Sequence, residues 1–195
     1  MTKGSYRVRV ISGELKGRLL YYPTSGSLRP TLQRAKSSIF DILRDSVRGA
    51  VFVDLFAAAG GIGIEALSRG ANFVCFVEQN ERALACLRRN LDTCRIEGHH
   101  YRICRADVVQ FVSEGHLTRL KPDIVYADPP YGQTDFAVLM ELLDKIAYSE
   151  HVSIIVEHPS SVSLTPSDRL LRIRQKSFGQ TSVSFFSAVG QGDNQ

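Results

Sequence analysis

The sequence predicts an α/β fold: a mostly parallel sheet with helices on both faces, an antiparallel C-terminal strand pair and a small N-terminal extension. Three observations support this fold class. Between residues 50 and 157, apolar runs of strand length alternate with helical patterns. The first 48 residues have the pattern of a β-hairpin and a helix, and the last apolar runs alternate like an antiparallel pair. At 195 residues the chain suits one domain with an appendage.

The N-terminal extension is predicted to span residues 1–48. Residues 6–11 and 18–22 alternate as two strands around a glycine-bounded turn, which predicts a hairpin. Because side chains two residues apart share a face, Arg7 and Arg9 should point the same way. Thr31 is the expected N-cap of a helix that runs to about residue 44.

The remaining chain is predicted to form one sheet domain over residues 49–190, with a flexible tail at 191–195. Strands are expected at 50–56, 72–78, 101–106, 123–127 and 151–157, with a closing pair at 170–176 and 182–189. Helices are expected through residue 68 and at 80–93, 107–112 and 135–148.

Positive charge is concentrated in the first quarter of the chain. Residues 1–50 hold ten Lys and Arg against three acids, whereas the rest of the chain is net acidic. Such asymmetry predicts a surface for a polyanion in the N-terminal extension.

Several other classes of protein are disfavoured. No apolar run approaches the roughly 20 residues that span a bilayer, and the first residues lack an apolar signal core, so we expect a cytoplasmic protein. The four cysteines, at 75, 86, 94 and 104, have no metal-ligand spacing and are expected to be free thiols. We expect no metal, and His99–His100 and Glu157–His158 are interpreted as structural or incidental.

A glycine-rich turn follows the first central strand. Gly60, Gly61 and Gly63 stand where a strand turns into a helix, and they would let the backbone approach a ligand closely. Either a dinucleotide pyrophosphate or a nucleoside-like cofactor suits such a turn. Asp54, just before the turn, favours the second because it would repel a phosphate and could hold an amino group.

Acids end four successive predicted parallel strands, and ligands bind at this edge of such sheets. They are Asp54, Glu78, Asp107 and Asp128. Asp128 is followed by two prolines and Tyr131. Neither proline has an N–H, so the turn is stiff and rich in acceptors, which suits a flat ring that carries an amine.

Residues 54–63 resemble the cofactor loop of class I S-adenosylmethionine-dependent methyltransferases, whose fold is Rossmann-like. Asp128–Tyr131 resembles the motif of enzymes that methylate exocyclic or amide nitrogens. Further segments resemble the RsmD family, which methylates guanine N2 in bacterial 16S rRNA. These segments are 9–18, 28–31, 64–71 and 179–181.

The resemblance implies an rRNA (guanine-N2)-methyltransferase that acts, as a monomer, on 16S rRNA within the small ribosomal subunit or its assembly intermediate. S-adenosylmethionine would be the cofactor and S-adenosylhomocysteine the product. The implied catalytic residues are Asp128, Pro129, Pro130 and Tyr131. The implied cofactor-binding residues are Asp54, Phe56, Ala57, Ala58, Gly60, Gly63, Glu78, Gln79, Asp107, Val108 and Asp128. The implied RNA-binding residues are Arg7, Arg9, Lys16, Arg18, Arg29, Arg34 and Lys36.

The chain departs from the family pattern at Ala58 and Ala59, where Gly and Ser are usual. Ala58 cannot adopt a positive φ cheaply, so the loop shape or the cofactor affinity could differ. An adenine-N6 or other amino methyltransferase on nucleic acid remains an alternative, because the turn would serve either amine. More remote alternatives are a protein-glutamine methyltransferase, a dinucleotide-dependent oxidoreductase and a non-catalytic RNA-binding module.

Overall fold

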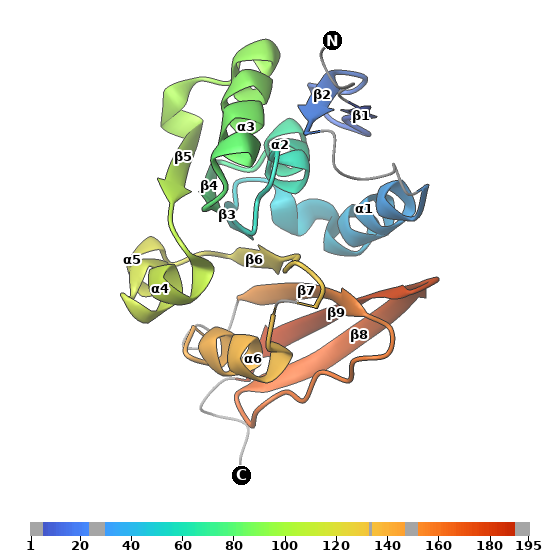
Figure 1. The fold of residues 1–195 in the computed structure, drawn as a ribbon, viewed down its shortest axis with the longest axis vertical. Helices are drawn as coiled ribbons and strands as arrows, with labels where there is room; N and C mark the ends of the chain where they lie inside the picture. The colour runs from blue at the N-terminus through green and yellow to red at the C-terminus, as the bar shows by residue number, and fades with distance from the viewer. Residues whose placement is uncertain (1–5, 24–29, 133, 147–151, 190–195) are drawn as a thin grey trace.

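The computed structural model describes residues 6–23, 30–132, 134–146 and 152–189. Its N-terminal strands, β1 (Tyr6–Arg9) and β2 (Leu19–Tyr22), form a separate antiparallel hairpin (Figure 1). The other strands form one sheet, which from edge to edge contains β5 (Tyr101–Arg105), β4 (Phe73–Glu78), β3 (Val51–Leu55), β6 (Ile124–Ala127), β7 (Ser153–Pro159), β9 (Thr181–Ala188) and β8 (Leu170–Phe178). The first five strands in this order are parallel, and the last two close the sheet as an antiparallel pair.

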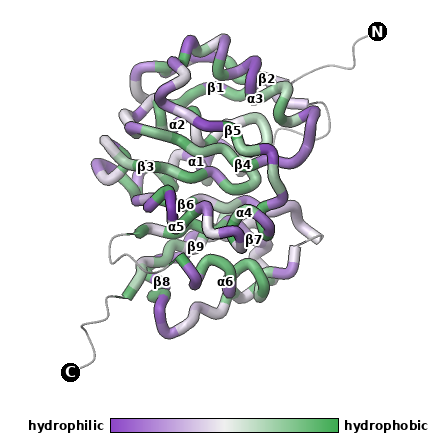
Figure 2. The backbone as a smooth tube through the Cα atoms, turned by 90° about the vertical axis from the view of Figure 1, so that its left-hand side faces the viewer, coloured by the Kyte–Doolittle hydropathy of each residue, from purple (hydrophilic) through white to green (hydrophobic). Residues whose placement is uncertain are grey.

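Helices cover both faces of this sheet. The hairpin packs on one face together with α1 (Pro30–Leu43), α2 (Gly61–Ser68) and α3 (Glu81–Cys94). The opposite face carries α4 (Val108–Ser113), α5 (His116–Leu120) and α6 (Phe136–Asp144). Alternate strand residues therefore enter different cores: Phe52 packs under α1 to α3, whereas Val53 packs under α4 to α6. This is why the central strands are apolar at successive positions, with the buried Asp54 as the exception on β3 (Figure 2).

The predicted fold class is confirmed. All the predicted strands are present, with ends that differ by a few residues. The sequence predicted no element between residues 113 and 122, but α5 lies there, after Gly115 reverses the chain at a φ of 72°. Helix α1 begins at Pro30, so the prediction of an N-cap at Thr31 was wrong. The predicted tail, residues 191–195, lies outside the described residues.

The hairpin is fixed to the body by hydrogen bonds at both of its ends. Near its turn, Ser68 of α2 accepts the Glu14 N–H at 2.8 Å, and a Cβ added to Gly13 would lie 1.7 Å from the same carbonyl oxygen. At the other end, Asn90 of α3 accepts the Tyr21 N–H and donates to the Tyr21 carbonyl, at 2.7 and 2.9 Å. Asn90 is fully buried, so these bonds satisfy its amide.

No helix within the described ranges is long and apolar enough to cross a membrane.

Candidate active site

A cavity of about 240 Å³ lies at the carboxyl ends of β3, β6 and β7. Strands β3 and β6 are the point where the chain reverses direction across the sheet, which is where ligands bind in such folds. The hairpin and α1 form the other wall. The lining residues are Tyr6, Val8, Tyr22, Gln33, Lys36, Asp54, Phe56, Ala57, Ala58, Gly61, Ile62, Tyr126, Asp128 and Glu157.

The loop between β3 and α2 is held in an unusual backbone conformation. Phe56, Ala58 and Gly60 have φ values of 63°, 47° and 82°, all in the left-handed region. Ala58 therefore does adopt a positive φ, which for a residue with a Cβ costs about 1–2 kcal/mol. The Glu78 carboxylate holds the strained segment by accepting the Ala58 N–H at 2.8 Å.

The glycines of this loop serve internal packing as well as ligand access. A Cβ at Gly63 would lie 2.2 Å from the Phe76 ring, and one at Gly60 would lie 2.4 Å from Leu87. At Gly61 it would lie 1.8 Å from the Tyr22 hydroxyl, so the hairpin and not a ligand requires that glycine. Internal packing thus already requires glycine at these three positions, and the close approach of the backbone to a ligand stays a prediction.

The four predicted acids do meet at one edge of the sheet, on neighbouring strands, but their surroundings differ. Asp54 is buried, and its carboxylate accepts the Gly63 N–H at 2.9 Å. Burial raises the pKa of Asp54 to about 7. Glu78 is half-buried, and Asp107 is exposed and caps α4 by accepting the Gln110 N–H. Asp54 and Asp128 therefore line the cavity, whereas Glu78 and Asp107 lie outside it.

The other predicted cofactor residues divide in the same way. Phe56, Ala57 and Ala58 line the cavity. Gln79 is exposed, Val108 is buried, and neither lines it.

The segment after β6 forms neither helix nor strand over residues 128–130 and turns at Tyr131 and Gly132. Pro129 is buried and Pro130 is exposed, so the turn has one face in the protein and one toward solvent. The Tyr131 ring is 37% exposed, and its hydroxyl donates to the Thr181 hydroxyl on β9 at 3.2 Å. The stacking of Tyr131 on a base stays a prediction.

Glu157 is a site residue that the sequence interpretation missed. It lies on β7, and because Ala127 pairs with Val156, it stands directly beside Asp128. Glu157 is 4% exposed, and its Oε2 accepts the Tyr126 hydroxyl at 2.7 Å. Its position at the end of the fifth parallel strand is the same signal that identified the other four acids.

The two neighbouring carboxyls influence each other. Burial, and then the charge of Glu157, raises the pKa of Asp128 well above its ordinary value. Burial also raises the pKa of Glu157. With Asp54, three carboxyls surround one small cavity, which therefore favours a ligand that carries positive charge.

The hairpin completes the cavity with aromatic rings. Tyr6 and Tyr22 stack with ring centroids 5.2 Å apart and an interplanar angle of 20°. The Tyr22 hydroxyl also forms a hydrogen bond with the backbone of Gly61. The N-terminal extension is thus in direct contact with the predicted cofactor loop.

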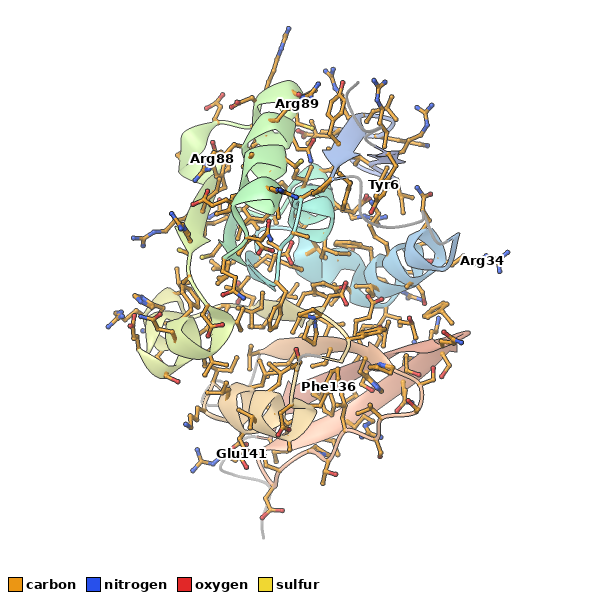
Figure 3. The ribbon with its side chains drawn as sticks, in the orientation of Figure 1. Tyr6, Arg34, Arg88, Arg89, Phe136 and Glu141 are labelled. Carbon is orange, nitrogen blue, oxygen red and sulfur yellow. The ribbon has the colours of Figure 1, made fainter. Side chains whose placement is uncertain are left out.

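Most of the predicted RNA-binding side chains are exposed, and the structure adds two more. Exposed on the hairpin or α1 are Arg7, Arg9, Lys16, Arg18 and Arg34, of which Arg34 projects from α1 (Figure 3). Arg88 and Arg89 are exposed on α3, and Figure 3 shows Arg88 on the side of this helix away from the hairpin. The Arg89 guanidinium lies 3.6 Å from the Tyr21 ring centroid, and that of Arg7 lies 4.9 Å from it. Arg29 lies outside the described residues.

The prediction that Lys36 binds RNA was wrong. Lys36 is 5% exposed, and its ammonium lies 3.0 Å from the Glu65 carboxylate and donates to the Arg9 carbonyl at 3.1 Å. Glu65 is fully buried on α2 and also pairs with Arg69, so Lys36 serves as a buried counter-ion.

No group of three or more His, Cys, Asp or Glu side chains within the described ranges is arranged to hold a metal ion.

Known proteins resemble this chain over nearly its whole length. The model of the family described as conserved hypothetical protein 95 matches residues 8–187. YlbH of Bacillus subtilis is 34% identical over 186 residues, which cover 94% of this chain and 100% of YlbH. Ribosomal RNA small subunit methyltransferase D of Escherichia coli is 27% identical over 194 residues, 98% of this chain and 95% of that protein. The solved structure of the Escherichia coli protein yhhF has a TM-score of 0.81 at 26% identity and covers 95% of this chain and 100% of its own.

Proposed function

This chain belongs to the conserved hypothetical protein 95 family, the RsmD family of methyltransferases, and we propose that it methylates the exocyclic N2 of a guanine in 16S rRNA. Methylation of rRNA with S-adenosylmethionine is the activity of this family. The observation that carries the choice of target is the pair of carboxyls, Asp128 and Glu157, in one cavity that the rings of Tyr6 and Tyr22 also line.

The residues of the cavity suit the cofactor. When bound, S-adenosylmethionine supplies an electrophilic methyl group on a positively charged sulfonium. Asp54, Asp128 and Glu157 place negative charge around the cavity that would receive this cation. A nearby cation favours the ionised form of a carboxyl, so it also offsets the raised pKa of Asp128. We expect Glu78 and Asp107, which lie outside the cavity on the next two strand ends, to bind the ribose and the adenine of the cofactor.

Asp128 and the Pro129 carbonyl orient the attacking amine. The lone pair of an exocyclic guanine amine is delocalised into the ring, so the amine is a weak nucleophile. If the Asp128 carboxylate and the Pro129 carbonyl accept its two N–H bonds, the nitrogen becomes pyramidal and its lone pair points at the methyl carbon. With the amine held in this way by Asp128 and Pro129, its nitrogen could take up the methyl group that S-adenosylmethionine would supply, and the C–S electron pair would stay on sulfur. The nitrogen then releases one proton, which Asp128 can accept. Positioning is the main source of the rate enhancement.

Tyr131 holds the target base out of its helix by stacking. A base–aromatic stack contributes about 1–3 kcal/mol, which offsets part of the cost of flipping a base. The Tyr131 hydroxyl bond to Thr181 fixes the ring against β9. Loss of the ring in Tyr131→Ala should therefore reduce the rate much more than loss of the hydroxyl in Tyr131→Phe.

The exposed arginines of the hairpin and of α3 bind the RNA backbone. Phosphate contacts position an RNA, and the cavity selects the base. Each phosphate contact steepens the dependence of log affinity on log salt by about 0.7–0.9. Arg9→Ala should flatten that dependence by about one contact, whereas the buried Lys36 should contribute nothing to it. A salt-independent affinity would contradict RNA binding by this surface.

The deciding experiment is transfer of a labelled methyl group to small ribosomal subunits and to naked 16S rRNA from cells that lack the enzyme, followed by mapping of the modified base. We expect N2-methylguanine at a single position. Asp128→Ala should lower the rate by about 10²–10³-fold, the usual effect of losing one group that acts on the transition state. Calorimetry should show that this variant still binds S-adenosylmethionine. Full activity of Asp128→Ala, or methylation of adenine N6, would refute the proposal.

A further inference from the structure

Glu157 has a free acceptor beside the group that holds the target amine. Parallel register places it next to Asp128, and both line the cavity. The Tyr126 hydroxyl donates to Oε2 of Glu157 at 2.7 Å, and within the described part of the chain no donor bonds to Oε1, which can therefore accept from a ligand. Because Glu157 is only 4% exposed, a ligand donor that reaches this oxygen has little competition from water.

The two carboxylates match the donor pattern of one purine. The Watson–Crick edge of guanine presents N1–H beside the N2 amine, so adjacent positions both donate. The corresponding edge of adenine presents the N6 amine beside N1, which is an acceptor. An ionised carboxylate only accepts hydrogen bonds. Adjacent acceptors at Asp128 and Glu157 therefore suit guanine, whereas adenine N1 would face a buried carboxylate with no hydrogen between them.

We propose that Glu157 is the specificity-determining residue of this enzyme: it accepts the N1–H of the target guanine while Asp128 holds the N2 amine. This inference rests on the proposed function and deepens it, because Asp128 and its turn alone would accept either amine. Tyr126 is the positioning residue. Its hydroxyl fixes the carboxyl of Glu157 so that one oxygen remains directed to the base.

The test compares guanine with 2-aminopurine, which lacks the O6 carbonyl and as a result has an acceptor instead of a donor at N1, so the variants at Glu157 and Tyr126 must separate the effect of N1 from that of O6. RNA is prepared with either guanosine or 2-aminopurine riboside at the methylated position. 2-Aminopurine keeps the N2 amine, but its N1 is an acceptor. Sites built to hydrogen-bond a group reject analogues that lack it by large factors. We expect the wild-type enzyme to prefer guanine by about 10²-fold or more in kcat/KM.

Glu157→Gln is the central variant, because its amide can donate to N1 of 2-aminopurine. We expect its preference for guanine to collapse toward unity, mainly through loss of activity on guanine. The matched control is Asp128→Asn, which acts on the amine that both bases share. It should slow both substrates by similar factors and leave the preference unchanged.

A second variant tests the inference independently, in case Glu157→Gln does not fold. Tyr126→Phe keeps the Glu157 carboxylate but removes the hydroxyl that fixes it, so the preference for guanine should fall by a smaller factor. Thermal unfolding shows whether each variant is folded.

The outcomes separate the two proposals. The inference is overturned if Glu157→Gln and Tyr126→Phe lower kcat/KM by the same factor for guanine and 2-aminopurine. It is also overturned if the wild-type enzyme methylates the two bases equally well. In either case Glu157 does not recognise N1–H, while guanine-N2 methylation can stand. If the wild-type enzyme methylates neither base, the proposed function itself fails and this inference fails with it.

Discussion

Replacing Glu65 with Gln should strongly destabilise the protein, although the two side chains have nearly the same shape. Glu65 is fully buried on α2. Its Oε2 accepts the Ile11 N–H at 2.8 Å and lies 3.0 Å from the Lys36 ammonium. Its Oε1 accepts the Ser12 N–H and the Arg69 guanidinium, both at 3.0 Å. One carboxylate therefore joins the hairpin, α1 and α2.

The expected loss in the free energy of unfolding follows from the hydrogen bonds and the charge pairing that the amide of Gln cannot provide. Gln has one acceptor oxygen, so one of the two backbone N–H groups would face an NH₂ and lose its partner. Lys36, which is 5% exposed, would lose its counter-ion. Breaking a buried ion pair from one side costs about 3–5 kcal/mol. Deprotonation of Lys36 limits the loss, because burial already lowers the pKa of this side chain. We therefore expect a decrease of about 3–4 kcal/mol in the free energy of unfolding, a large part of a typical total of about 5–15 kcal/mol.

Urea unfolding followed by circular dichroism measures this loss. The double variant Glu65→Gln/Lys36→Met removes the uncompensated charge and should recover about 1 kcal/mol or more. Glu141→Gln is a matched control, because Glu141 is exposed on α6 (Figure 3), and it should not shift the midpoint. If Glu65→Gln stays within about 1 kcal/mol of the wild type, or if the double variant is less stable than the single one, the account of a buried charge network is wrong.

Three further predictions concern the loop, its acid and the stacked rings. Ala58→Gly should leave the free energy of unfolding unchanged or raise it by up to about 1 kcal/mol, because glycine relieves the strain of the positive φ. The control Ala85→Gly, on the exposed face of α3, should lower it by about 1 kcal/mol. Equal losses for the two variants in urea unfolding would show that Ala58 is not strained. Because the pKa of Asp54 is raised in the folded protein, folding takes up a proton there, and the free energy of unfolding of the ligand-free protein should fall as pH rises from about 4 to 7. In Asp54→Asn this free energy should fall less over the same pH range. An equal fall in the variant and the wild type would exclude Asp54 as the cause. Tyr22→Phe, which loses the hydroxyl bond to Gly61, should weaken cofactor binding in calorimetry more than Tyr21→Phe does.

The sheet and its strand-end acids could be predicted because each depends on local pattern. A strand buried on both faces is mostly apolar, and an acid at or near its C-terminal end must lie at the carboxyl edge of the sheet. This reasoning placed Asp54 and Asp128 correctly. The same reasoning applied to the fifth strand would have found Glu157, but the following His158 and Pro159 favoured a structural interpretation.

Features that depend on partners distant in sequence could not be predicted. Lys36 lies off the apolar stripe of α1, which predicts exposure, and only the fold places it against Glu65, 29 residues later. The contact of Tyr22 with Gly61 likewise joins two elements whose docking no local pattern records. The conformation of Ala58 was judged unfavourable from the residue alone, yet Glu78 and the neighbouring strand hold it in place.

The hydrogen bonds of the hairpin to Ser68 and Asn90 fix its position relative to the cavity, so the hairpin can set the distance between bound RNA and the cavity. Bonds at both ends prevent it from swinging, so the span between its arginines and Asp128 is constant. When the hairpin binds an RNA backbone, only a nucleotide at one fixed distance from the bound phosphates can enter the cavity. The choice of nucleotide along a strand would then be set by length, while the cavity checks only the identity of the base that arrives. Shortening or loosening the hairpin should therefore move methylation to neighbouring positions before it abolishes it.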